Sequence, residues 1–150
     1  MEACNEISEC IKNETAGGIT EIDLSHNMIA DLSPLGHFTD LQQLILDYNY
    51  VKALDSLPIM PTLKVLSLSY NQLNNREHLT VKLAAKCPAL EHLNLMKNPC
   101  NPVFSNQGEY KLFRAKFSIW IPTLKTLDGP DFKDDQEMIT KIKGLENAKR

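Results

Sequence analysis

Apolar residues, most of them leucine, recur at fixed positions in four segments of the chain that align without gaps. The first, fourth and sixth positions of each segment are apolar and the ninth is asparagine; the segments are 19–29, 41–51, 63–73 and 90–100. The four asparagines, Asn27, Asn49, Asn71 and Asn98, are 22, 22 and 27 residues apart. Agreement over four segments at a period of roughly 20 to 29 residues indicates an internal structural repeat.

Leucines at the fourth and sixth positions alternate with other residues, which predicts a short strand in each repeat. Its leucines are directed inward and their neighbours outward. One strand and its return segment cannot bury their apolar side chains alone, so the repeats must stack on one another. The ninth-position asparagine carries donors and an acceptor that can satisfy buried backbone groups of the turn. The pattern therefore predicts an α/β fold, a short curved right-handed solenoid with a parallel β-sheet on its concave face.

The return segments differ in length, which predicts different structures on the convex side. Residues 78–87 place Leu79, Leu83 and Cys87 four residues apart, the spacing of a helical stripe. The shorter connections at 31–35 and 54–58 suit irregular or 3-10 turns. Cys100 stands where the other repeats have Ile, Val or Leu, which predicts a small buried side chain with little reactivity.

Both ends of such a stack need caps, because an open end would expose the leucine column and unpaired strand edges. We expect one domain over 1–150, with an N-terminal cap at 1–18, repeats at 19–100, a C-terminal cap at 101–129 and a tail at 130–150. Apolar residues at helical spacing support the N-terminal cap; they are Ile7, Cys10 and Ile11.

The C-terminal flank predicts a helix over 109–121 followed by a degenerate fifth repeat that begins at Leu124. The helix should place four residues on one face: Phe113, Phe117, Trp120 and Ile121. In the tail, the spacing of four apolar residues permits a further amphipathic helix, which could cap the core or bind elsewhere; they are Met138, Ile139, Ile142 and Leu145.

The leucine content reflects the repeat scaffold, and the charge distribution limits the kinds of partner that the protein can bind. Leucine supplies 21 of the 150 residues, and the net charge of −3 is unevenly distributed. Residues 1–60 hold 10 acidic and 2 basic residues, whereas residues 61–150 hold 9 and 14. In an elongated molecule this gives an acidic N-terminal end and a basic C-terminal end, which can steer partners. Blocks of consecutive Lys or Arg are missing, so direct nucleic-acid binding is not expected.

The chain start lacks the features of a signal peptide, and no run of 18 apolar residues occurs. These patterns predict a cytoplasmic protein without a transmembrane segment, whose irregularly spaced cysteines are reduced thiols; they are Cys4, Cys10, Cys87 and Cys100. We expect no metal and no cofactor, because metal-binding Cys and His spacings and glycine-rich phosphate loops are missing.

The repeat L-x-x-L-x-L-x-x-N-x-L, followed by Asn98-Pro99, residues 110–114 and residues 122–128, resembles the intracellular leucine-rich repeat group. This group is typified by the phosphatase-1 regulatory subunit and the spliceosomal U2 A-prime protein, and its members share a C-terminal leucine-rich repeat cap. The resemblance covers about residues 19–129. It implies the solenoid fold and, as alternative functions, a ribonucleoprotein scaffold in the nucleus or a phosphatase regulatory subunit.

The stretches 88–93, 109–114 and 121–128 more closely resemble the family of the leucine-rich melanocyte differentiation-associated protein. That resemblance implies a small adaptor in endosomal or lysosome-related-organelle trafficking. Its partners would be a Rab GTPase and a Retriever-type sorting complex, and it would reach endosomes through them.

The outward positions of the repeats are the candidate binding residues, since solenoids present extended surfaces to protein partners. Aromatic and apolar side chains beside acidic ones suit a protein interface. The predicted concave-face residues are Glu21, Asp23, Ser25, Gln43, Ile45, Asp47, Tyr48, Val65, Ser67, Tyr70, His92, Asn94, Met96 and Lys97. The protein is expected to be monomeric on its own.

An enzyme would have to use Ser25, His26 or His92 with nearby polar residues. Strand side chains on a flat lattice do not form an enclosed, water-free pocket, and adjacent Ser25 and His26 should point in different directions. The sequence therefore predicts a non-enzymatic protein without catalytic residues.

Overall fold

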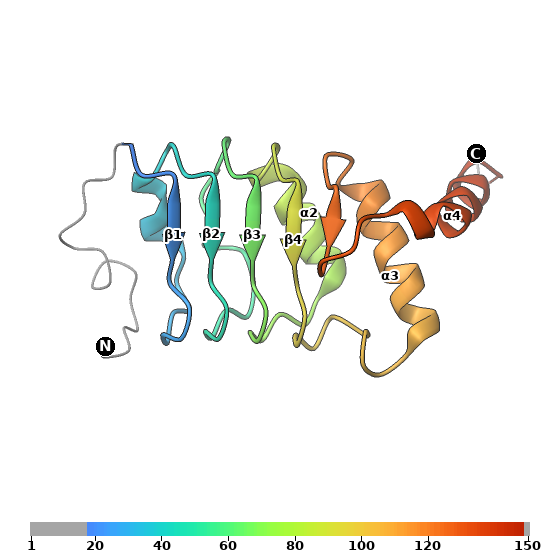
Figure 1. The fold of residues 1–150 in the computed structure, drawn as a ribbon, viewed down its shortest axis with the longest axis horizontal. Helices are drawn as coiled ribbons and strands as arrows, with labels where there is room; N and C mark the ends of the chain where they lie inside the picture. Colours follow the sequence, from blue (N-terminus) through green and yellow to red (C-terminus); the bar gives the residue numbers. More distant parts are fainter. Residues whose placement is uncertain (1–17, 149–150) are drawn as a thin grey trace.

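The protein forms a stack of parallel strands with helices and turns behind them (Figure 1). The structure, a computed structural model, describes residues 18–148; the predicted N-terminal cap, with Ile7, Cys10 and Ile11, lies outside the described residues except for Gly18. The strands are β1 (Glu21–Asp23), β2 (Gln43–Ile45), β3 (Val65–Ser67), β4 (His92–Asn94) and β5 (Thr126–Leu127), hydrogen-bonded in sequence order. This arrangement confirms the predicted open α/β leucine-rich repeat solenoid.

The strand register follows the repeat alignment. Leu44 pairs with Leu66, and Leu66 in turn pairs with Leu93, so each fourth-position leucine lies beside its equivalent. These side chains are buried, as are the sixth-position leucines behind them. The core is therefore a column of leucines that runs the length of the stack, as the periodicity predicts.

The predicted asparagine ladder is confirmed. The side-chain amide of Asn71 donates to the backbone carbonyls of Leu46 and Leu68 at 2.9 and 3.0 Å, and its oxygen accepts from the Val51 amide at 3.0 Å. Asn49 makes the equivalent bonds one repeat earlier. Each amide thus joins two adjacent turns that would otherwise bury unpaired backbone groups.

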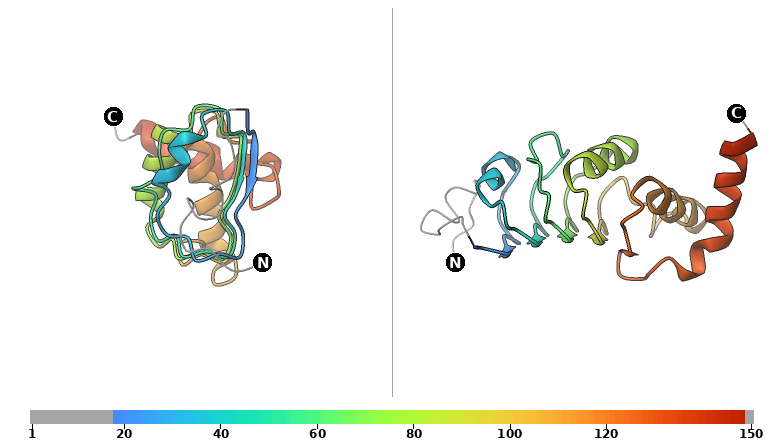
Figure 2. Two further views of the ribbon diagram at one scale, coloured as in Figure 1. Left: turned by 90° about the vertical axis from the view of Figure 1, so that its left-hand side faces the viewer. Right: turned by 90° about the horizontal axis from the view of Figure 1, so that it is seen from above.

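The convex side contains the elements predicted for the return segments (Figure 2). A 3-10 helix, η1 (Ser33–His37), follows the first strand, and residues 54–58 form an irregular turn. The longer fourth return segment forms α2 (Arg76–Lys86), which buries Leu79 and Leu83. It begins two residues before the predicted segment because the Asn75 side chain caps it, accepting from the His78 amide at 3.0 Å.

The C-terminal part contains α3 (Gln107–Trp120), the 3-10 turn η2 (Lys133–Asp135) and α4 (Gln136–Ala148). Helix α3 buries Phe113 and Phe117, and Ile121 follows it into the core. Trp120, predicted on the same face of the helix, is not buried with them. Trp120 is the last residue of the helix and its side chain is 37% exposed, beside a surface hollow that Val81 and Ala84 of α2 also line.

Helix α4 crosses the end of the stack against α3 (Figure 2). Ile139 is buried in the core, Met138 and Ile142 are half-buried against it, and Leu145 is 65% exposed. The tail helix was predicted either to cap the core or to bind elsewhere. Its first half caps the core, and its last turn extends into solvent. Within residues 18–148, no helix combines the length and apolar character that crossing a membrane requires.

Buried polar groups join the cap to the fourth repeat. Asp128 accepts hydrogen bonds from the Tyr110 hydroxyl, the Asn101 amide and the Leu95 backbone amide at 2.7–2.8 Å. Arg114 of α3 donates to the carbonyls of Leu127, Pro130 and Asp131 and forms an ion pair with Asp135. These contacts fasten the degenerate fifth repeat to α3 and η2.

The two cysteines in the described part of the chain, Cys87 and Cys100, are free and buried, which confirms the buried position predicted for Cys100. Burial raises the pKa of Cys87 to about 12 and that of Cys100 to about 11, from an ordinary value of 9.0. Because the thiolate is the nucleophile, both thiols should resist iodoacetamide near pH 8 in the folded protein and react in urea. Labelling of each cysteine-containing peptide, measured by mass spectrometry, checks this, and rapid native labelling would contradict it.

The same shifts give the direction of the pH dependence. A raised pKa means that the unfolded chain loses its thiol protons before the folded protein does. The stability from these protonated thiols is fully present below pH 9 and is lost as the pH rises toward 11 to 12.

Candidate protein-binding site

The strands lie side by side in one sheet (Figure 1), so the outward positions of β1 to β4 form one continuous face. We call the outward strand residues the concave sheet face; they are Glu21, Asp23, Gln43, Ile45, Val65, Ser67, His92 and Asn94. Glu21 and Asp23 are exposed, whereas Ile45 and Val65 are half-buried. The face therefore has an acidic end on β1 and a more apolar centre on β2 and β3.

Several predicted binding residues also stabilise the turns that follow the strands. Asp23 accepts from the Ser25 backbone amide at 2.9 Å, and Asn94 accepts from the Met96 amide at 3.0 Å. Asp47 accepts from the Ser69 amide at 2.9 Å. These oxygens replace hydrogen bonds that the tight turns cannot make, so their polarity serves the fold as well as the surface.

Ser67 has to be removed from the predicted accessible face. Its side chain is buried, and its hydroxyl donates to the Asp47 carboxylate at 2.6 Å. The sequence assigns it an outward position correctly, but Asp47 of the neighbouring repeat folds over it. Three of the predicted concave-face residues occupy the seventh position of their repeats and are half-buried at the ends of the strands; they are Ser25, Asp47 and Met96.

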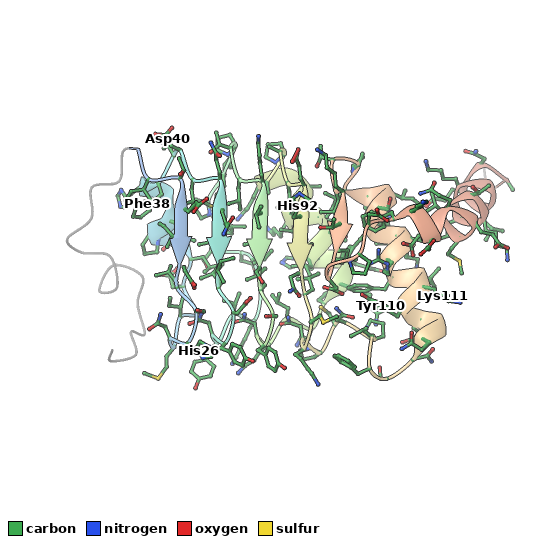
Figure 3. The ribbon with its side chains drawn as sticks, viewed as in Figure 1. His26, Phe38, Asp40, His92, Tyr110 and Lys111 are labelled. Carbon is green, nitrogen blue, oxygen red and sulfur yellow. The ribbon has the colours of Figure 1, made fainter. Side chains whose placement is uncertain are left out.

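The C-terminal end of the concave sheet face carries polar residues in place of the carboxylates of β1. His92 lies on β4, where its ring Nδ1 is 2.8 Å from the Thr126 hydroxyl on β5 (Figure 3). Lys125 and Glu91 form an exposed ion pair at 3.2 Å. The Lys125 hydrogen bond keeps the pKa of Glu91 below its usual value. Among the residues of the concave sheet face, the carboxylates are thus confined to its β1 end.

The eighth-position residues lie at the loop edge of the stack, after the strands; His26 marks this edge in Figure 3. His26, Tyr48, Tyr70 and Lys97 all have left-handed backbones, with φ of 57–59°. The His26 and Tyr48 rings stack at 4.3 Å between centroids, and those of Tyr48 and Tyr70 at 4.2 Å. Tyr48 and Tyr70, predicted as concave-face residues, thus form a stack that borders the concave sheet face and does not lie on it.

Sequence reasoning missed other side chains at this edge. Tyr50 is 49% exposed and Phe104 is 67% exposed, and the Lys97 ammonium lies 4.2 Å from the centre of the Phe104 ring. Tyr50 occupies the tenth position of its repeat, next to the framework asparagine, where the pattern leaves the residue type free. The recurrence of Met28 and Tyr50 at this position is the signal that could have indicated it.

Both candidate catalytic imidazoles have structural neighbours. His26 stacks on Tyr48, whereas His92 contacts Thr126 at the C-terminal end of the sheet. His26 and His92 lie at separate places in the molecule (Figure 3). The arrangement favours a binding surface over a nucleophilic site.

Comparisons with known proteins identify related leucine-rich repeat chains, although no family model matches. The human leucine-rich melanocyte differentiation-associated protein is 31% identical over 119 residues, which cover 76% of this chain and 60% of that protein. Human leucine-rich repeat-containing protein 23 is 33% identical over 82 residues, covering 55% and 22%. The chain thus spans less than two thirds of either relative.

A solved structure supports the fold. A chain in the crystal structure of the Drosophila melanogaster SNF/U2A′ complex superposes with a TM-score of 0.64 at 24% identity. The match covers 83% of this chain and 68% of that one.

Proposed function

We propose that this chain, a leucine-rich repeat protein of the type that ends in a C-terminal cap, is a non-enzymatic adaptor that binds a protein partner on its concave sheet face. The observation that carries the proposal is the exposed sheet face itself. Half-buried Ile45 and Val65 lie on adjacent strands, with the Glu21 and Asp23 carboxylates at one end. An apolar centre with a polar rim is the usual anatomy of a protein interface.

The acidic β1 end of the concave sheet face indicates how the partner is oriented. A helix or folded domain with basic side chains at one end would place them over β1, and its apolar side chains would cover Ile45 and Val65. Long-range attraction of this kind raises association rates and fixes orientation more than it raises affinity. We therefore expect partner binding to weaken as salt is added.

The similarity to the leucine-rich melanocyte differentiation-associated protein favours a role in endosomal or lysosome-related-organelle trafficking. In that role the partners would be a Rab GTPase or a subunit of a Retriever-type sorting complex. The adaptor would be cytoplasmic, monomeric by itself, and brought to endosomes by its partners. A nuclear ribonucleoprotein scaffold remains the alternative outcome of the experiment below.

The test compares Ile45→Asp with Val81→Asp in quantitative affinity capture from cell lysate. Val81 is an exposed apolar residue of α2 on the convex side, so it is a matched control. A carboxylate placed at Ile45 would be desolvated by the partner, and capture should fall about tenfold or more, while Val81→Asp should retain it. Thermal unfolding of both variants controls for folding.

The identity of the captured proteins tests the finer proposal. A Rab GTPase or a sorting-complex subunit lost with Ile45→Asp supports trafficking, and spliceosomal proteins support the ribonucleoprotein alternative. Equal capture by Ile45→Asp and the unmodified protein would contradict binding on the concave sheet face.

A further inference from the structure

We infer that the loop edge of the stack is a second binding surface, which takes an extended acidic segment of a protein partner. We call this surface the loop-edge strip; its residues are His26, Tyr48, Tyr50, Tyr70, Lys97 and Phe104. The strip borders the concave sheet face and has the opposite charge preference. It extends the proposed function, since the ligand is again a protein, but it depends on different residues.

The strip is one ordered row of side chains. Three rings stack from His26 through Tyr48 to Tyr70, and the row continues with Lys97, whose ammonium lies over Phe104. Four repeats carry the row, so at a strand spacing of about 4.8 Å it spans about 15 Å. That length matches about four or five residues of extended chain.

The row includes residue types that its backbone does not favour. At φ of 57–59° the left-handed conformation is easiest for glycine or asparagine, yet two of the four residues are tyrosines. Their side chains remain 43–44% exposed despite the stacking. Large aromatic side chains held in a strained, exposed position are typical of interaction surfaces.

The chemistry of the strip favours an anion. A surface hollow of about 390 Å³ lies along it, lined by Tyr48, Tyr50, Tyr70, Lys97 and three framework asparagines, with no carboxylate among the lining residues. The amides of Asn49 and Asn71 already donate to backbone carbonyls. The tyrosine hydroxyls and the Lys97 ammonium are therefore the groups that can face a ligand.

These groups all suit a carboxylate. Phenol hydroxyls and an ammonium donate hydrogen bonds, and the edge of an aromatic ring carries partial positive charge. The pKa of Tyr48 is raised, chiefly by the hydrogen bond between its hydroxyl and Tyr70, so this phenol stays a neutral donor. Phe104 adds an apolar contact at the end of the row. By contrast, Glu21 and Asp23 would repel an acidic segment from the concave sheet face.

Three synthetic peptides with the same extended backbone test the inference: five repeats each of Glu-Pro, Gln-Pro and Lys-Pro. NMR titration of the ¹⁵N-labelled protein measures both affinity and location. The Glu-Pro peptide should bind at least about tenfold more tightly than the Gln-Pro peptide and shift the amide signals of residues 48, 70 and 97. The Lys-Pro peptide should not shift them.

Two variants locate the site. Lys97→Gln should weaken Glu-Pro binding about fivefold or more, and Tyr70→Asn, which suits the left-handed backbone, should also weaken it without loss of folding. Lys64→Gln, at an exposed lysine on the opposite edge, is the control. Equal binding of the three peptides, no binding of any, or equal losses with Lys97→Gln and Lys64→Gln would overturn the inference.

The concave variant separates this inference from the proposed function. Ile45→Asp should bind the Glu-Pro peptide normally while losing its lysate partner. If Ile45→Asp loses its lysate partner but the unmodified protein does not bind the Glu-Pro peptide, the adaptor proposal stands and the loop-edge strip is not a binding surface.

Discussion

Replacing Arg114 with alanine should lower the free energy of unfolding by about 3–5 kcal/mol, an effect as large as that of truncating a buried core side chain. The Arg114 side chain is 8% exposed, and its ion-pair partner Asp135 is 10% exposed. Without the guanidinium, the Asp135 carboxylate and the carbonyls of Leu127 and Asp131 lose their buried donor. An uncompensated buried charge costs more than the ion pair contributes when intact.

The loss should be greatest at the C-terminal end of the stack. Arg114 also lies 4.9 Å from the centre of the Phe132 ring, so its removal loosens the segment that leads into α4. Urea unfolding followed by circular dichroism measures the total effect, and hydrogen exchange should show the first loss of protection in residues 126–148.

Lys125→Ala is the matched control for the cap. Lys125 pairs with Glu91 in the same region, but its side chain is 64% exposed. Exposed ion pairs contribute no more than about 1 kcal/mol, so this variant should unfold almost like the unmodified protein. Comparable losses of unfolding free energy in the two variants would contradict the conclusion that Arg114 holds the C-terminal cap in place.

Replacing Asn71 with alanine should cost about 3 kcal/mol or more, since it leaves buried backbone groups of two turns without partners. Asn71 bonds the Leu46 and Leu68 carbonyls and the Val51 amide. Alanine fills too little space to replace the side chain and can make none of these bonds. Because each repeat is stabilised mainly by its neighbours, a break between the second and third repeats weakens the stack at its centre.

Asn74→Ala supplies the comparison, because Asn74 is an exposed asparagine three residues further along the same turn region. Its replacement should change stability by no more than about 0.5 kcal/mol. Chemical unfolding of both variants checks the difference. A cost below about 1 kcal/mol for Asn71→Ala would mean that the ladder does not hold the turns together.

The features that repeat could be predicted from the sequence, because the same physical constraint recurs in each repeat. The leucine column, the asparagine ladder and the position of the α2 helix all follow from spacing. The first turn of α2 was missed because it depends on the Asn75 cap, which precedes the apolar stripe. The tail helix could be recognised, but its placement depends on contacts with α3 that no local pattern encodes.

The candidate site was predicted less completely. The position of a residue within its repeat locates it on the sheet, but it does not show that Asp47 reaches across one repeat to bond Ser67. Trp120 follows the helical period of the buried face, and only the end of α3 beside α2 leaves it at the surface. The left-handed backbone at the eighth position places Tyr48 and Tyr70 at the loop edge and not on the sheet. This placement can be recognised only from the backbone geometry.

Site-specific photo-crosslinking tests the central claim most directly, because it reports contact without depending on the loss of binding. A benzophenone side chain would replace Val65 on the concave sheet face in one variant and Val81 on α2 in the other. We predict a crosslinked adduct of one defined mass from position 65 that Ile45→Asp abolishes, and little adduct from position 81. Adducts from position 81 alone, or equal yields from both positions, would contradict binding on the concave sheet face.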